Sequence, residues 1–181
     1  MPRFPLEAGP CLIRPWRSGD KAALVKHADN RRIWLNLRDI FPYPYTAKDA
    51  DVWLAHVAEQ DPVTSLAIEA GGEAVGGIGL LLGGDVHRLS AEIGYWLGEG
   101  VWGRGIATAA LRAFTPWAFA TFGLERIWAG VFSTNPASMR VLEKAGYVRE
   151  AVLRSAVVKD GALLDQVIYA TLRLSDHPGV G

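Results

Sequence analysis

The stretch AEIGYWLGEGVWGRGIAT, residues 91–108, decides how the fold is interpreted. Residues 91–97 have the length of a strand, Gly103 and Gly105 mark a turn, and the longest predicted helix follows over residues 105–122. The first N–H groups of a helix have no internal partners, and the helix dipole makes that end positive. Because glycine has no Cβ to keep a phosphate away from these groups, the turn predicts a cradle for a diphosphate.

Three interpretations of this turn are open from its own residues. The first is a dinucleotide site, because Gly98, Gly100 and Gly103 fit the spacing G-x-G-x-x-G. Against it, the preceding strand carries Glu92, and no acidic residue that would bind a ribose follows the next strand near Ser133. The second is the diphosphate cradle, although a P-loop is excluded because no Gly-Lys-Ser/Thr follows. In the third, the glycines only turn the chain and cap the helix.

The order of the remaining segments predicts an α+β fold. Predicted strands cover residues 12–14, 65–70, 74–82, 91–97, 126–132, 148–158 and 163–172. Antiparallel hairpins are followed by a strand–helix–strand unit, which favours an open α+β sheet over a doubly wound α/β fold. We expect one domain over residues 1–181, with its core at about 10–173 and a short flexible C-terminal tail.

Composition and charge exclude several classes of protein. Half of the 181 residues are apolar and 21% are charged, as in one globular domain. Lys plus Arg and Asp plus Glu both number 19, and a net charge of zero argues against a nucleic-acid or membrane partner. A single cysteine, Cys11, excludes an intramolecular disulfide, and four scattered histidines have no metal-ligand spacing. We therefore expect a cytoplasmic protein without a metal site.

A second motif, NPASMRVLEKAGY, occupies residues 135–147, about 30 residues after the glycine turn. With both motifs present, the chain resembles the GNAT superfamily of acetyl-CoA-dependent N-acetyltransferases. The family's pyrophosphate loop, Gln/Arg-x-x-Gly-x-Gly/Ala, is matched by residues 102–107. Residues 12–16, 91–97 and 152–154 look like the RimJ/RimL-type branch. The resemblance covers nearly the whole chain, and four degenerate motifs in the right order are together specific.

This resemblance implies a fold, an activity and a cosubstrate. The fold is a mixed, mostly antiparallel sheet of about seven strands, splayed in the middle and flanked by helices. The activity is transfer of an acetyl group from acetyl-CoA to a primary amine, either a protein N-terminal amine or a small-molecule amine. The implied cosubstrate-binding residues are Tyr95, Trp96, Leu97, Trp102, Gly103, Arg104, Gly105, Ile106, Ala107, Thr108, Asn135 and Ser138.

Two catalytic residues are implied by the resemblance. Glu92 matches a strand glutamate that serves as a base in some members, and Ser138 resembles the RimL-type acid that protonates the leaving thiolate. Many members use a tyrosine for that acid, but here Leu142 stands at its position. Each residue also has a structural interpretation. Glu92 fits an exposed strand residue paired with a cation, Asn135 fits a helix cap, and Ser138 fits a first-turn hydroxyl.

The acceptor site is expected at the early helices, where the family builds it. Trp34, Phe41 and Tyr43 lie in that segment, and Asp165 on the last hairpin is a weaker candidate for the base. The aromatic residues also fit ordinary packing, and Asp165 fits a solvated strand end. Two other functions stay open, a non-catalytic acyl-CoA-binding sensor and an NAD-dependent oxidoreductase. Exposed edge strands would also permit a homodimer.

Overall fold

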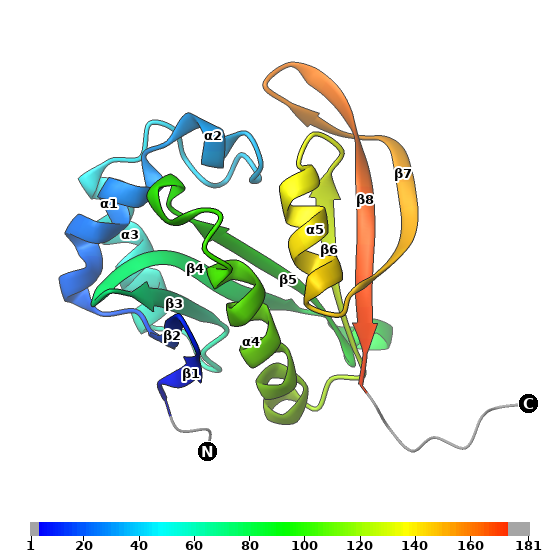
Figure 1. The fold of residues 1–181 in the computed structure, drawn as a ribbon, viewed down its shortest axis with the longest axis horizontal. Coiled ribbons are helices and arrows are strands. Elements are labelled where there is room, and N and C mark those ends of the chain that lie inside the picture. Colours follow the sequence, from blue (N-terminus) through cyan, green and yellow to red (C-terminus); the bar gives the residue numbers. More distant parts are fainter. Residues whose placement is uncertain (1–3, 174–181) are drawn as a thin grey trace, which may run out of the picture.

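A computed structural model describes residues 4–173, which form an eight-stranded sheet flanked by helices (Figure 1). The strands are β1 (Leu6–Ala8), β2 (Cys11–Pro15), β3 (Ser65–Ala70), β4 (Glu73–Leu82), β5 (Ser90–Leu97), β6 (Arg126–Phe132), β7 (Val148–Lys159) and β8 (Ala162–Leu172). The α-helices are α1 (Lys21–Ala28), α2 (Arg31–Trp34), α3 (Ala47–Ala58), α4 (Ile106–Phe122) and α5 (Pro136–Lys144). Three 3₁₀ turns are η1 (Ser18–Asp20), η2 (Asp85–His87) and η3 (Glu99–Val101).

The sheet is mixed and splayed at its centre, which confirms the predicted fold class. Its strand order is β1-β2-β3-β4-β5-β6-β8-β7, and the parallel pair is β5 with β6. That pair is joined over three positions, from Ser90 opposite Arg126 to Glu92 opposite Trp128. Beyond Glu92 the two strands diverge, as Figure 1 shows. Backbone groups of β5 that would otherwise pair with β6 are therefore left for other partners.

The sheet has eight strands where about seven were predicted. The additional strand is β1, which pairs antiparallel with β2 from Leu6 opposite Ile13 to Ala8 opposite Cys11. A three-residue strand next to prolines has too few positions to show an alternating pattern. The sheet therefore begins at Leu6, and Ala8 is buried in the core. The expected flexible tail, residues 174–181, lies outside the described residues.

Each face of the sheet is covered by its own helices. Figure 1 shows α4 and α5 side by side in front of the strands, and buried side chains of α4, including Leu111 and Phe114, form the larger core with them. On β5, Leu97 belongs to this core, whereas the adjacent Trp96 packs against the smaller cluster built by α1 and α3. Successive strand residues point to opposite faces, so β5 presents side chains to both layers. Within residues 4–173 no helix is long and apolar enough to cross a bilayer.

Candidate active site

A cavity of about 1540 Å³ lies where β5 and β6 separate. It is lined by the N-terminal ends of α4 and α5, by both diverging strands, and by the loop that joins α2 to α3, residues 35–46. The cavity brings together Glu92, Phe41 and every residue predicted to bind the cosubstrate: Tyr95, Trp96, Leu97, Trp102, Gly103, Arg104, Gly105, Ile106, Ala107, Thr108, Asn135 and Ser138.

The glycine turn leaves the start of α4 open toward this cavity. Gly103 and Gly105 have φ angles of 74° and 76°, the left-handed region that side chains with a Cβ rarely adopt. Gly105 is the N-cap of α4, and among residues 4–173 no side chain accepts a hydrogen bond from the first N–H groups of that helix. Arg104 holds the turn by donating from Nη2 to the carbonyl oxygen of Gly100 at 3.0 Å. The arrangement fits an anion at the helix N-terminus.

Trp102 fastens the same turn to the end of β5. Its indole Nε1 donates to the carbonyl oxygen of Leu97 at 2.8 Å, and the guanidinium of Arg32 lies 5.3 Å from the ring centroid. Trp102 therefore contributes a side-chain contact as well as backbone to the turn. Leu97 lies beyond the point where β5 and β6 separate, so the indole satisfies one of the unpaired carbonyl groups.

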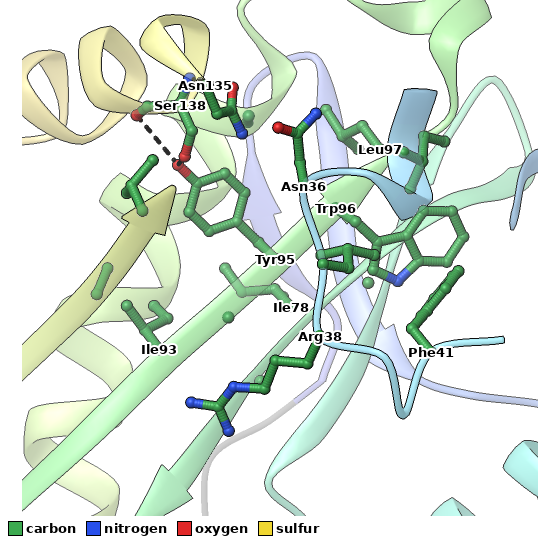
Figure 2. Close-up of a pocket in the computed structure, with 18 of the residues that line it drawn as sticks. Asn36, Arg38, Phe41, Ile78, Ile93, Tyr95, Trp96, Leu97, Asn135 and Ser138 are labelled. Atoms are coloured by element: carbon green, nitrogen blue, oxygen red, sulfur yellow. Dashed lines mark hydrogen bonds between the residues drawn. The ribbon is translucent and has the colours of Figure 1, made fainter. Parts of the chain in front are cut away.

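Two hydroxyl groups meet beside the turn, from β5 and α5. The phenol oxygen of Tyr95 lies 2.7 Å from Oγ of Ser138, and Figure 2 shows the ring pointing from the strand to the helix. Asn135 caps α5, because its Oδ1 accepts the N–H of Ser138 at 3.2 Å. Burial raises the pKa of Tyr95 to about 12, although the hydrogen bond with Ser138 opposes that shift. The phenol therefore stays protonated at neutral pH.

Glu92 lies on the other face of β5, in an ion pair. Nη2 of Arg38 donates to both carboxylate oxygens, at 2.6 and 2.5 Å. The Glu92 side chain is 17% exposed and that of Arg38 is 56% exposed, so the pair lies at the edge of the cavity. The geometry agrees with the structural interpretation of Glu92 as a paired strand residue. It also leaves the carboxylate in the cavity lining.

The α2–α3 loop spans both halves of the splayed sheet through two adjacent residues. Arg38 reaches Glu92 on β5, and Oδ1 of Asp39 accepts a hydrogen bond from Nζ of Lys159 at 2.6 Å. Lys159 ends β7, is 3% exposed, and lies with its Nζ 3.7 Å from the ring centroid of Trp34. The loop is therefore held on β5 at one side and on the β7–β8 hairpin at the other.

Residues 11–148 match the family model described as acetyltransferase (GNAT) domain. The chain belongs to the GNAT acetyltransferase family. Its resemblance to the RimJ/RimL-like branch is also confirmed. The ribosomal-protein-serine acetyltransferase of Escherichia coli is 34% identical over 83 residues, 46% of each chain. The structure of Mycobacterium smegmatis RimJ in complex with CoA-disulfide is 29% identical, with a TM-score of 0.80, covering 94% of this chain and 86% of that one.

Other relatives of this GNAT domain are matched over part of their length. The probable N-acetyltransferase YjcK of Bacillus subtilis is 42% identical over 88 residues, 49% of each chain. The chain spans about half the length of the first curated relatives it matches. The matched structures cover more of the fold, including an acetyltransferase of the GNAT family from Bacillus anthracis with a TM-score of 0.81 over 93% of this chain and 98% of that one, at 22% identity.

Three of the four predicted acceptor residues lie outside the cavity of this GNAT domain. Trp34 and Tyr43 stack on each other with ring centroids 5.8 Å apart, and neither lines the cavity. Asp165 does not line it either, because its Oδ1 accepts the backbone N–H of Ser155 at 2.8 Å within the β7–β8 hairpin. Phe41 does line the cavity, edge-on to Trp96 at 5.6 Å, as Figure 2 shows.

Sequence reasoning missed two polar side chains of this site. Arg38 and the phenol of Tyr95 both lie in the cavity lining, but the first was not singled out and the second was expected only to supply backbone. For Tyr95 a signal was present. It is an odd-numbered position of β5, like the buried Ile93 and Leu97, so it faces α5 rather than the α1–α3 layer. For Arg38, on an irregular loop, no periodic signal exists.

Proposed function

We propose that this GNAT domain is an acetyl-CoA-dependent N-acetyltransferase that acts on a primary amine. The observation that carries the proposal is the shared cavity. It joins the uncapped start of α4 to the Tyr95–Ser138 hydroxyl pair and, across β5, to Glu92. The first feature fits the diphosphate of acetyl-CoA, and the other two fit the proton donor to the thiolate and the proton acceptor from the amine that acetyl transfer uses.

The start of α4 fits the diphosphate of acetyl-CoA. Its N–H groups are free of side-chain caps, and no heavy atom outside the turn lies within 4 Å of an ideal Cβ at Gly103 or Gly105. Arg104, in the turn itself, adds positive charge beside this helix end, and Arg140 of α5 adds another cation to the cavity lining. The solved RimJ of Mycobacterium smegmatis carries a CoA-disulfide, which supports the same class of ligand here.

Ser138 is the proposed proton donor to the departing thiolate, with Tyr95 behind it. As the C–N bond forms, the C–S bond of the thioester breaks, and the sulfur needs a proton. Ser138 Oγ gives its proton to the sulfur and takes the phenol proton of Tyr95, 2.7 Å away. The phenolate then regains a proton from solvent, and Glu92 releases to solvent the proton that it took from the amine, so both groups return to their starting state. Leu142, at the position of the tyrosine used by other members, is fully buried and has no access to the cavity. The hydroxyl pair is therefore the proposed acid in place of the tyrosine that many members use.

Glu92 is the proposed acceptor of the proton that the amine loses. The attacking nitrogen must be neutral, and a carboxylate in the lining removes the proton directly or through one water molecule. Arg38 occupies both oxygens from one side, so it positions the carboxylate. The amine approaches on the side of the carboxylate that Arg38 does not cover.

Two measurements test the proposal in sequence. Isothermal titration should show binding of acetyl-CoA and none of NAD, which separates this function from an oxidoreductase. Thiol release from acetyl-CoA in the presence of a panel of primary amines should then exceed the rate without amine, and mass spectrometry should find the acetylated amine. Binding of acetyl-CoA with no acceleration by any amine would instead support the acyl-CoA sensor.

A further inference from the structure

Next to Glu92, the face of β4 and β5 that carries this residue has few side chains. Residues opposite each other in an antiparallel pair point to the same face. The pairs on this face are Leu81 with Glu92, Gly79 with Gly94, and Gly77 with Trp96, and all six residues line the cavity. Between the Leu81–Glu92 pair and the Trp96 ring, the cavity surface is therefore formed by Gly79 and Gly94, and we call this surface the floor.

The space above Gly94 is open. A Cβ added at Gly94 would meet no heavy atom within 4 Å, whereas one at Gly79 would lie 2.9 Å from the carbonyl oxygen of Thr64. Gly94 is two positions from Glu92 on the same face, so a ligand whose nitrogen reaches Glu92 can rest its body on this floor.

The walls around this floor are apolar and exposed. Ile40 of the α2–α3 loop is 91% exposed, Val52 of α3 is 63% exposed and Leu81 of β4 is 59% exposed, and all three line the cavity. Isolated exposed apolar residues are common on protein surfaces, but three that line one cavity indicate a contact for an apolar ligand. Phe41 and Trp53 complete the same lining.

The charges of the lining do not favour a polycation. Among residues 4–173, the carboxylates that line the cavity belong to Glu92, Asp49 and Asp160, and each has a partner within the chain. Glu92 binds Arg38, Asp49 caps α3 by accepting the N–H and hydroxyl of Thr46, and Asp160 binds Arg31. Among the described residues, the lining holds seven Lys and Arg side chains against these three carboxylates, so a polyamine would meet a net positive charge.

We propose that the acceptor is a primary amine attached to an apolar body, which lies over Gly94 against Leu81, Val52 and Ile40. This inference rests on the proposed function and names its substrate class. The same chemistry is offered by a small aralkyl amine and by a peptide whose first residue is apolar. Polycationic acceptors such as polyamines and aminoglycosides are poor substrates.

The test compares four acceptors at fixed acetyl-CoA: 2-phenylethylamine, a pentapeptide beginning with leucine, spermidine and an aminoglycoside. We expect kcat/KM for 2-phenylethylamine or for the peptide to exceed that for both polycations by about tenfold or more. The better of the two apolar acceptors identifies the source of the amine. Preference for a polycation would overturn the proposal.

Variants of neighbouring leucines supply a matched control. Leu81→Ser should raise KM for the apolar acceptor about tenfold with little change in kcat. It removes an apolar contact that stabilises the bound acceptor and the transition state equally. Leu82→Ser should leave both constants unchanged, because Leu82 is also exposed, at 41%, but does not line the cavity. Gly94→Leu should fill the floor and abolish acceptor use while acetyl-CoA binding is kept. Equal effects of Leu81→Ser and Leu82→Ser would refute the assigned wall.

A binding measurement separates this inference from the proposed function. Titration of 2-phenylethylamine and of the peptide into the CoA-loaded protein reports acceptor affinity without turnover. If either acceptor binds and Leu81→Ser weakens that binding, the apolar site is supported even where no thiol is released. The absence of thiol release would refute only the acetyltransferase activity. Acetylation of amines with no loss of affinity in Leu81→Ser or Gly94→Leu would support the activity and refute the apolar site.

Discussion

Tyr95 and Ser138 are 43 residues apart in the chain, yet their hydroxyl oxygens lie 2.7 Å from each other. The contact exists because β5 bends away from β6 and turns Tyr95 toward the first turn of α5 (Figure 2). A hydroxyl in the first turn of a helix ordinarily bonds within its own turn, but here Ser138 Oγ faces a second side chain. The pair is therefore part of the cavity rather than only a feature of the helix end.

Removal of either hydroxyl should slow turnover without loosening the cosubstrate. For Ser138→Ala and Tyr95→Phe we expect kcat to fall about 100-fold, the lower range for loss of a general acid. The Kd of acetyl-CoA, measured by titration, should change less than about twofold, since the diphosphate contacts at α4 are untouched. Equal losses in kcat and in affinity would assign the pair to binding.

A second hydroxyl pair supplies the control for that experiment. Thr115 and Tyr147 lie 2.8 Å apart at their hydroxyl oxygens, are buried, and do not line the cavity. Tyr147→Phe should cost about 1 kcal/mol of unfolding free energy and leave kcat unchanged. A loss of kcat in Tyr147→Phe similar to that in Tyr95→Phe would mean that the effect is structural.

Gly105→Ala should weaken acetyl-CoA binding where Gly100→Ala does not. Gly105 has a φ of 76°, so a Cβ there strains the backbone by about 1 kcal/mol and shifts the N–H groups that start α4. Gly100 lies five residues earlier with a φ outside the left-handed region and open space around its Cβ. Titration of both variants with acetyl-CoA and a thermal melt of each check this. Similar affinities in the two variants would contradict the cradle.

Glu92→Gln should change the pH dependence of kcat/KM in a defined direction. If the carboxylate takes the proton of the amine, its loss should flatten the rise of the rate from low pH, while the basic limb keeps its shape. Asp165→Asn is the matched variant, because that carboxylate was the other candidate base and does not line the cavity. Its profile should match the wild type. An unchanged profile in Glu92→Gln would remove Glu92 as the base.

The buried pair of Arg14 and Asp20 should make stability depend on pH. Nη1 and Nη2 of Arg14 donate to the two oxygens of Asp20 at 2.7 and 2.8 Å, and the side chains are 4% and 9% exposed. Burial alone would raise the pKa of Asp20, but hydrogen bonds from Arg14 and from the Arg17 N–H outweigh it, so the pKa is lowered.

The sign of that shift sets the pH range. Because the folded pKa lies below the unfolded value of about 3.9, the pair stabilises the fold above that value, and the contribution is lost as the pH falls through the folded pKa. Asp20→Asn should lower the unfolding free energy by about 3 kcal/mol at pH 7 in urea and by less near pH 2. Lys21→Ala, which breaks the exposed Lys21–Asp51 pair, should change it by less than about 0.5 kcal/mol.

Features of the site that depend on local backbone geometry were predictable from the sequence. Asn135 before a proline predicts a helix cap, and the structure shows its Oδ1 accepting the N–H of Ser138. Gly105 before the longest helix predicts a turn, and its φ is positive. Each of these interactions involves residues within a few positions of each other, so the sequence order already contains the geometry.

Contacts between distant elements were not predictable in the same way. Arg38 and Glu92 are 54 residues apart, and Asp39 and Lys159 are 120 apart, so their pairing depends on how the irregular α2–α3 loop lies across the finished sheet. Trp34 shows how a prediction from position in the sequence alone can miss such a contact. Its place in the sequence suggested an acceptor pocket, but the end of β7 brings Lys159 over its ring.

The α2–α3 loop links the position of β5 to that of the β7–β8 hairpin. Consecutive Cα atoms are 3.8 Å apart, so the backbones of Arg38 and Asp39 cannot separate if the distance between Glu92 and Lys159 increases. Each pair has one shielded and one exposed member: the Glu92 and Arg38 side chains are 17% and 56% exposed, and those of Lys159 and Asp39 are 2% and 72% exposed. A change in the separation of β5 and the β7–β8 hairpin is therefore expected to displace this loop, and with it Ile40, the next residue in the chain, which lines the cavity.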